Sequence, residues 1–414
     1  MKQQQIMEEA EQVLYKIYNR FPVVFDHGKG VTLTDVDGVD YLDFGAGIAV
    51  MALGYDYPGF NDAVKAQVDK LYHISNLFYS EPMAEAGRKL LAASGMEKAF
   101  FTNSGTEAVE GALKVAKRHA CNRHMGRDYE IIAMKHSFHG RSLGALSVTG
   151  NDHYQEPFAP LVPGIRFATF NDLDSVKALM NEKTCAVILE TIQGEGGIYP
   201  ATEDFLQGVR ALCDQYDALL ILDEIQCGMG RSGSMFAWQQ YGVKPDVMTV
   251  AKALGNGVPV GAFLASKAAA RAMQPGDHGT TYGGNPLVCA AASKVLDIFE
   301  QDGIVDHVRQ TGAYLWDRLE ELMARHACIV AHRGRGLIQG LEFSVPAGPI
   351  VENALVKQHL VLISAGSHVI RFVPPLVIRK EDVDQMIIRL EQAVTEVYSG
   401  VSASPSGSPS MEVQ

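Results

Sequence analysis

Five short apolar runs, separated by amphipathic segments, dominate the chain between residues 95 and 300. The runs are KAFFT (98–102), EIIAM (130–134), TCAVILE (184–190), ALLILD (218–223) and DVMTVA (246–251). Each has the length of a strand without polar alternation, so we expect strands that are buried on both faces. Segments with helical periodicity, such as 104–119 and 203–216, lie between them. This alternation predicts an α/β fold whose mostly parallel sheet is covered by helices on both sides.

The two ends of the chain depart from this central pattern. TDVDGVDYLDF near residue 40 predicts a turn-rich hairpin, and a helical pattern at 304–327 precedes the short strands LIQGLEF and HVIRFV. We therefore expect residues 1–50 and 301–398 to form one smaller α+β domain beside a large domain of residues 51–300. Residues 399–414 are rich in Ser, Pro and Gly, a composition typical of a disordered tail.

The charge balance argues against two classes of partner. The chain has 36 Lys and Arg against 48 Asp and Glu, a net charge of −12, which disfavours non-specific binding to nucleic acid or to an anionic membrane. The six cysteines form no CxxC pair, and we expect reduced thiols in a cytoplasmic protein. The polar N-terminus lacks the apolar core of a signal peptide, and no apolar run is long enough to span a bilayer.

The segment TNSGTEAVE directly follows the run at 98–102. Ser104 and Glu107 have the spacing of a capping box, so a helix is predicted to begin here, and Gly105 allows the backbone to approach a ligand closely. The free amides of such a helix start suit a phosphate. The alternative is a well-capped helix that binds nothing.

Two charged residues follow two further apolar runs. Asp223 ends the run at 218–223, where a carboxylate needs a cation or a hydrogen-bond donor. Magnesium and a protonated pyridine nitrogen are both candidates, but neither GxxxxGK[ST] nor GxGxxG precedes Asp223, which disfavours a nucleotide enzyme. Lys252 opens a Gly-rich loop and is a surface lysine, a phosphate-binding lysine or a nucleophile. A nucleophilic lysine, an acid and a phosphate cup at successive strand ends meet the needs of pyridoxal 5'-phosphate.

Six motifs in order make the chain resemble the class III aminotransferases, of the fold-type-I pyridoxal-phosphate group. They are FFTNSGTEAVE, SFHGRSLGALSVTG, TIQGEGG, LLILDEIQCGMGRSG, TVAKALGNGVPVGA and TTYGGNPL, and the resemblance runs from about Tyr18 to Leu390. It implies an α/β fold-type-I transferase with a smaller domain built from both chain ends. It also implies pyridoxal 5'-phosphate as cofactor, amino-acid and 2-oxoglutarate substrates, and a homodimer with shared active sites.

The resemblance also implies a role for individual residues. Lys252 would hold the cofactor as a Schiff base and then move a proton, and Asp223 would keep the pyridine nitrogen protonated. The other implied cofactor contacts are Gly105 and Thr106 at the phosphate, Phe138 on the ring, Gln226 at the phenolic oxygen, and Thr281 reaching the phosphate from the neighbouring subunit. The implied substrate contacts are Arg371 for the α-carboxylate, Arg141 for a second carboxylate or distal group, Thr280 nearby, and Glu195, which neutralises an arginine when the donor is no diacid. His136 and His139 lack further ligands, so no metal site is expected.

Within the family, four stretches resemble the acetylornithine aminotransferase group: YNRFPVVFDHGKG, YLDFGAGIAVMALG, LYHISNLFYSEP and ISAGSHVIRFVPPL. The resemblance implies transfer of the δ-amino group of N-acetylornithine to 2-oxoglutarate, in arginine biosynthesis. The alternatives are an ornithine, succinylornithine or 4-aminobutyrate aminotransferase, or a cofactor-binding protein without activity. GYDYP departs from the family's usual GHxHP, and the replacements Tyr55 and Tyr57 leave the exact donor open.

Overall fold

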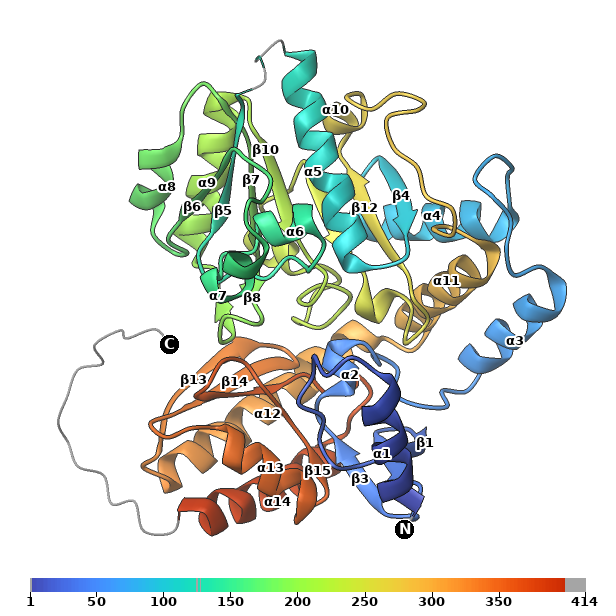
Figure 1. Ribbon diagram of the computed structural model, residues 1–414, viewed down its shortest axis with the longest axis vertical. Coiled ribbons are helices and arrows are strands. Elements are labelled where there is room, and N and C mark those ends of the chain that lie inside the picture. Colours follow the sequence, from blue (N-terminus) through green and yellow to red (C-terminus); the bar gives the residue numbers. More distant parts are fainter. Residues whose placement is uncertain (1, 124–125, 127, 399–414) are drawn as a thin grey trace.

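The computed structural model describes residues 2–123, 126 and 128–398, and the predicted tail at 399–414 lies outside the described residues. It has two lobes, of which the upper one in Figure 1 is built on a seven-stranded sheet and the lower one on two four-stranded sheets. None of the helices in this described part is long and apolar enough to cross a bilayer.

The seven-stranded sheet has the order β4-β12-β11-β10-β7-β5-β6. Its strands are β4 (Lys98–Thr102), β5 (Glu130–Met134), β6 (Ile165–Ala168), β7 (Thr184–Glu190), β10 (Leu219–Asp223), β11 (Val247–Val250) and β12 (Gly261–Ala265). β12 runs antiparallel to both of its neighbours, whereas β11, β10, β7, β5 and β6 pair in parallel. The predicted mostly parallel sheet is therefore confirmed.

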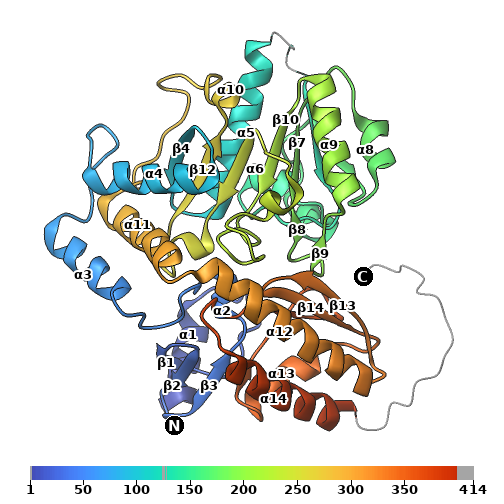
Figure 2. The same cartoon turned by 180° about the vertical axis from the view of Figure 1, so that it is seen from behind.

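Helices cover both faces of this sheet, because successive residues of the central strands enter different cores. Ile188 and Ile221 pack in a core with α5 (Gly105–Asn122), whereas their neighbours Leu189 and Leu222 pack in a core with α9 (Glu203–Tyr216). Figure 1 shows α5 in front of the sheet, and Figure 2 shows α9 on the opposite side. The run of apolar residues in each strand thus has the expected cause, burial on two faces.

The structure corrects the sequence analysis at two places. KAFFT was expected to be buried on both faces, but β4 is the edge strand of the sheet, and Lys98 at its start is exposed. Two strands of this sheet, β6 and β12, were not predicted, because Arg166 interrupts the apolar pattern of IRFA and GAFLA follows directly on a glycine-rich loop. β12 alone breaks the parallel pattern.

The lower lobe joins the two chain ends. One sheet contains β1 (Phe25–Lys29), β2 (Thr32–Asp35), β3 (Asp40–Asp43) and β15 (Leu360–Val361), and β15 pairs in parallel with β3. The other contains β13 (Ile329–Arg335), β14 (Ile338–Phe343), β17 (Val369–Phe372) and β16 (Ile363–Ser364). The predicted hairpin near residue 40 is confirmed as β2 and β3. The smaller α+β part therefore uses both ends, while the domain limits at 50 and 300 stay a prediction.

The remaining helices surround these sheets. They are α1 (Lys2–Val13), α2 (Ala46–Ala49), α3 (Phe60–Lys70), α4 (Glu81–Ser94), α6 (Leu143–Ser147), α7 (Asp152–Gln155), α8 (Leu173–Leu179), α10 (Lys267–Ala270), α11 (Pro286–Gln301), α12 (Ile304–Arg325), α13 (Gly348–Val356) and α14 (Lys380–Tyr398). α11 leads directly into α12, so these two helices carry the chain from the upper lobe to the lower one (Figure 2).

Candidate active site

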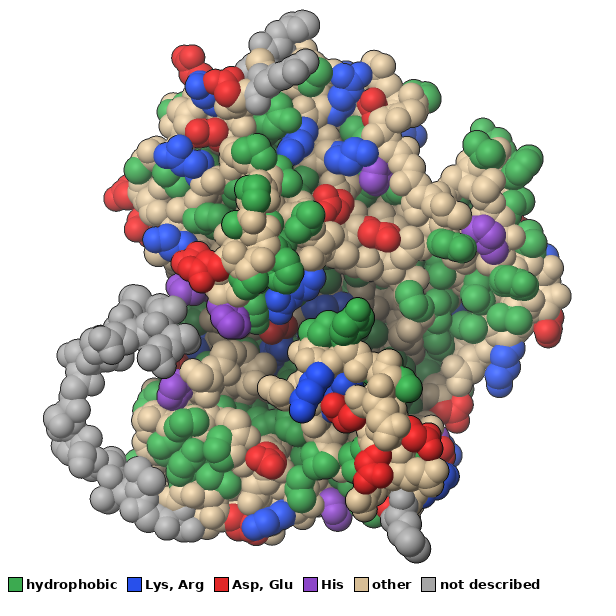
Figure 3. Space-filling view, in the orientation of Figure 1, with side chains coloured by type: hydrophobic (Ala, Val, Ile, Leu, Met, Phe, Trp, Pro, Cys, Tyr) green, Lys and Arg blue, Asp and Glu red, His purple; other side chains and the backbone are tan. Residues whose placement is uncertain are grey.

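A cavity of about 410 Å³ opens at the carboxyl edge of the large sheet, where α/β proteins bind their ligands. Figure 3 shows the surface hollowed between the two lobes, with basic side chains inside the hollow. Of the residues predicted from the sequence, seven line the cavity: Gly105, Thr106, Phe138, Arg141, Asp223, Gln226 and Lys252. Residues from four loops therefore meet at one place, as expected for residues that follow the ends of successive strands.

Lys252 lies two residues after the end of β11 and faces the cavity with a half-buried side chain. Its backbone has a φ of 46°, a left-handed conformation that a non-glycine residue adopts only when its surroundings impose it. Burial lowers the pKa of Lys252 to about 8; the charge of Arg371 acts in the same direction, and Glu195 and Asp223 oppose it. A much larger fraction of this amine is uncharged at neutral pH than for an ordinary lysine, as a nucleophile requires.

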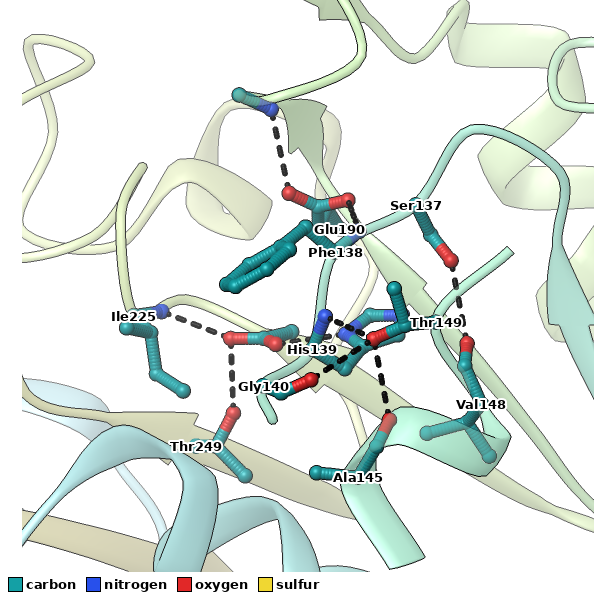
Figure 4. Close-up of polar contacts among 12 residues, drawn as sticks. Ser137, Phe138, His139, Gly140, Ala145, Val148, Thr149, Glu190, Ile225 and Thr249 are labelled. Atoms are coloured by element: carbon teal, nitrogen blue, oxygen red, sulfur yellow. Dashed lines mark hydrogen bonds and ion pairs between the residues drawn. The ribbon is translucent and has the colours of Figure 1, made fainter. Parts of the chain in front are cut away.

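The carboxylate of Asp223 is 3% exposed and is held by three donors at the end of β10. One oxygen accepts from the amide of Ile225 and from the hydroxyl of Thr249, both at 3.0 Å. The other lies 2.7 Å from Nδ1 of His139, whose ring is fully buried (Figure 4). Burial alone would lower the pKa of His139, but its hydrogen bond with Asp223 and the nearby acids raise it. The imidazole therefore gives the buried Asp223 carboxylate a hydrogen-bond partner whose charged form is favoured.

Glu190 is a cavity residue that the sequence analysis missed. It ends β7 and lies directly opposite Asp223 in the parallel register. Its carboxylate accepts from the amides of Phe138 and Gly194, at 3.1 and 3.2 Å (Figure 4). Burial raises the pKa of Glu190 to about 7, and the charge of Asp223 adds to this effect. The argument that selected Asp223, an acid at the end of a buried strand, applies equally to Glu190 and would have found it.

The N-terminus of α5 forms another wall of the cavity. The hydroxyl of Ser104 accepts from the amide of Glu107, as predicted, but Glu107 reaches back to the amide of Asn103 rather than to that of Ser104. Among the described residues, no protein group accepts from the amides of Gly105 and Thr106. A Cβ added to Gly105 would stand 2.9 Å from Ile225, so the close approach of these loops requires glycine. These two amides can bind an anion.

Arg371 and Glu195 are not among the residues that line the cavity, but Arg371, which is 3% exposed, contacts Gln226, which does line it. Its Nη1 donates to Glu195 at 2.6 Å and to the side-chain oxygen of Gln226 at 2.9 Å. Burial would raise the pKa of Glu195, but the charge and hydrogen bond of Arg371 hold it below its usual value. Gln226, predicted to contact the cofactor, thus also contacts Arg371, and the arginine is neutralised by Glu195 in this structure.

Arg141 is exposed at the mouth of the cavity and is held by stacking. Its guanidinium carbon lies 3.6 Å from the centroid of the Tyr154 ring and 5.5 Å from that of Phe138. Planar stacking of this kind leaves the edges of the guanidinium free to donate to a carboxylate. Tyr154, which follows Arg141 by thirteen positions in the chain, had no signal in the sequence.

The remaining predicted residues lie away from the cavity wall. The hydroxyl of Thr280 is 3.4 Å from the side-chain amide of Asn103, a cavity residue, and Thr281 is exposed. Tyr55 and Tyr57 donate to Asp43 and Asp302, at 2.7 and 2.5 Å. In the described part of the chain, none of these four residues lines the cavity, so Tyr55 and Tyr57 give no direct explanation of donor choice.

A lysine with a lowered pKa, a buried acid held by three donors and two helix amides without a protein acceptor among the described residues meet at one edge of a mixed α/β sheet, and together they define an enzyme that uses a phosphorylated carbonyl cofactor. The donor set fits pyridoxal 5'-phosphate, since the amides suit its phosphate, Asp223 its protonated ring nitrogen and Lys252 its aldehyde. Residues 15–394 match the family Aminotransferase class-III, and the chain belongs to that family. It is a pyridoxal-phosphate-dependent aminotransferase.

Known proteins resemble the chain over nearly its whole length. The acetylornithine aminotransferase of Methanocaldococcus jannaschii is 43% identical over 96% of this chain and 100% of its own length. The N-acetylornithine aminotransferase structure from Stenotrophomonas maltophilia has a TM-score of 0.82 at 36% identity, covering 94% of this chain and 99% of its own. An ornithine aminotransferase structure from Toxoplasma gondii, described with partial occupancy of PLP at the active site, has a TM-score of 0.92 at 29% identity, covering 95% and 94%.

The pKa of Lys252 predicts how uptake of the cofactor depends on pH. Because only the neutral amine attacks an aldehyde, and because the pKa is lowered to about 8, the rate of covalent uptake by the apoenzyme should rise with pH up to about 8 and then level off. Stopped-flow absorbance of apoenzyme mixed with pyridoxal phosphate measures this rate. A rate that keeps rising towards pH 10, as for an ordinary lysine, would contradict the prediction.

Proposed function

We propose that this protein transfers the δ-amino group of N-acetylornithine to 2-oxoglutarate, giving N-acetylglutamate semialdehyde and glutamate, a step of arginine biosynthesis. The observation that carries the proposal is the pair of arginines. Arg141 stacks on Tyr154 at the exposed side of the cavity and has no acidic partner among the described residues, whereas Arg371 is neutralised by Glu195. The likeness to the acetylornithine aminotransferase of M. jannaschii supports the choice of donor.

Two substrates of different charge must use the same cavity in turn. 2-Oxoglutarate has two carboxylates, and we assign Arg371 to its α-carboxylate and Arg141 to the other, since a guanidinium binds a carboxylate in bidentate fashion. The reacting end of N-acetylornithine has no carboxylate, so an uncovered Arg371 there would be a buried cation without a partner. Glu195 supplies that partner, and its carboxylate must leave when the diacid enters.

The cofactor, when bound, withdraws electrons from the substrate carbon that carries the reacting nitrogen. We assign the proton transfer to Nζ of Lys252, which removes the proton from that carbon and returns it on the cofactor side. Asp223, whose carboxylate is fixed by His139 and Thr249, would hold the ring nitrogen in its protonated form. The amides of Gly105 and Thr106 would bind the phosphate, and Phe138, which also lines the cavity, would contact the ring.

We also propose a homodimer in which Thr281, with Thr280 beside it, completes the partner's active site. Large apolar side chains of the loop between α3 and α4 support a shared interface: Leu77, Phe78 and Tyr79 are 88%, 62% and 99% exposed. Figure 3 shows apolar side chains gathered on this side of the molecule, over α3 and the loop that follows it. Six free cysteines without a disulfide support a reducing compartment, the cytoplasm.

The donor is tested by adding single amino donors to the holoenzyme without a keto acid and following the visible absorbance of the bound cofactor. We expect N-acetylornithine to change the spectrum with a kcat/KM at least about tenfold above those of ornithine and 4-aminobutyrate, since contacts with an acyl group contribute a few kcal/mol. A faster response to ornithine or 4-aminobutyrate would show that this amine is the donor in place of N-acetylornithine, within the same family of aminotransferases. A comparable response to N-succinylornithine would show a broader acyl preference.

A further inference from the structure

The gate loop, defined here as residues 194–198, carries Glu195 and forms the tip of a small hairpin. Its flanking strands are β8 (Ile192–Gln193) and β9 (Tyr199–Pro200). The loop rests on the sheet of β13, β14 and β17 in the lower lobe. In that sheet Arg333, Gly340 and Arg371 stand side by side in register, one on each strand. The gate loop therefore lies across these three residues, with Arg333 on one side of Gly340 and Arg371 on the other.

Arg333 binds the far end of the gate loop, as Arg371 binds Glu195. Its Nε donates to the carbonyl oxygen of Gly197 at 2.7 Å, and its guanidinium carbon lies 4.0 Å from the centroid of the Tyr199 ring. Nη1 of Arg333 pairs with Glu342 at 2.5 Å, which fixes the guanidinium plane from the other side. The side chain is 15% exposed. Arg333 thus makes a charge-assisted hydrogen bond to the loop backbone, in contrast to the side-chain pair of Arg371.

The last residue of the loop, Ile198, packs on Gly340. Ile198 is fully buried and has a φ of 61°, a strained conformation for a β-branched residue. A Cβ added to Gly340 would stand 3.0 Å from Ile198, so any larger residue at this position would push the loop away from the sheet by a few tenths of an ångström. Backbone strain of this kind persists only where the neighbours hold the chain, which is what Arg333 and Gly340 do here.

We infer that Arg333 is a positioning residue for substrate choice: it fixes the gate loop on the sheet, so that the side chain of Glu195 alone moves when Arg371 changes partner. The inference rests on the proposed roles of Glu195 and Arg371. With the backbone anchored, Glu195 returns to Arg371 as soon as the diacid leaves. Without Arg333, Glu195 is held less well and Arg371 stays uncovered when a donor without an adjacent carboxylate binds.

The test compares the two half-reactions of the holoenzyme, followed separately by absorbance. Arg333→Met should lower kcat/KM about tenfold for N-acetylornithine and less than about twofold for glutamate, which binds Arg371 itself. Tyr199→Leu should lower the ratio of kcat/KM for N-acetylornithine to kcat/KM for glutamate about threefold. Because the side chain of Tyr199 is 41% exposed, this second variant tests the inference even if Arg333→Met misfolds. Arg335→Met is the matched control, because Arg335 lies on the same strand but contacts Gln240 and Tyr241.

A double-mutant cycle separates positioning from a general loss of stability. If Arg333 acts through Glu195, then adding Arg333→Met to the Glu195→Gln variant should change kcat/KM for N-acetylornithine less than about twofold. Equal losses for donor and glutamate, or full additivity with Glu195→Gln, would overturn the inference. If the wild-type enzyme ignores N-acetylornithine, the proposed donor is wrong. The same cycle then runs with ornithine or 4-aminobutyrate, whose reacting carbons also lack a carboxylate.

Discussion

Lys252→Ala should abolish transamination and covalent binding of the cofactor together. The variant loses both the nucleophile and the base, and general-base catalysis alone contributes about 10²–10⁴-fold, so kcat should fall by at least that factor. The loss should come with little change in unfolding temperature, because the charged form of this amine is disfavoured by burial and removing it relieves that cost. Steady-state kinetics and the visible spectrum of the purified variant check both statements.

The matched control is Lys267→Ala, at an exposed lysine in the first turn of α10. It should keep normal turnover and a normal spectrum. An external amine such as methylamine should restore part of the activity of Lys252→Ala, since it can take over the proton transfer in the cavity. Normal turnover by the Lys252→Ala variant itself would overturn the assigned mechanism.

Asp223→Asn should lower kcat by about 10²–10³-fold, the magnitude typical of removing one preorganised electrostatic contact. Asparagine keeps the shape and can still accept from Ile225 and Thr249, but it carries no charge to hold a proton on the ring nitrogen. The pKa of His139 should fall as well, because its bond with Asp223 is what raises it. Kinetics and the NMR titration of His139 measure the two effects.

Asp214→Asn is a suitable control for this variant. Asp214 lies on α9, and its side chain is 67% exposed in a pair with Arg210. Because exposed ion pairs contribute little, neither kcat nor stability should change appreciably. If Asp223→Asn kept more than about a tenth of the wild-type kcat, the carboxylate would not be the group that controls the ring nitrogen.

The strands and helices of the large sheet were the most predictable part of the molecule. The apolar runs that end at Glu190 and Asp223 coincide with β7 and β10, because a strand buried on both faces leaves a continuous hydrophobic signal. The predicted helix at 203–216 coincides with α9, which begins with Thr202 as its cap. β12 was missed because it begins with Gly261, directly after the glycine-rich loop, so that the loop pattern continues into the strand.

Local motifs indicated the cavity, but they did not indicate its polar contacts. Lys252, Asp223 and Gly105 come from strand ends, and the chain's local pattern marks such positions. His139, Tyr154 and Arg333 act through partners more than ten positions away in the chain: Asp223, Arg141 and Gly197. No periodicity or short motif encodes a contact of that kind.

By itself, the sequence determined the α/β class, five of the seven strands of the large sheet, and the three chemical groups that a pyridoxal-phosphate enzyme needs. Each of these depends on neighbours within about twenty residues, where side-chain pattern and backbone preference act directly. Only the tertiary structure decided that the arginine paired with Glu195 is Arg371, 176 positions away, and that Arg333 binds the backbone of the loop that carries Glu195. Such pairings are set by the packing of one sheet against another lobe, so they exist only once the chain has folded.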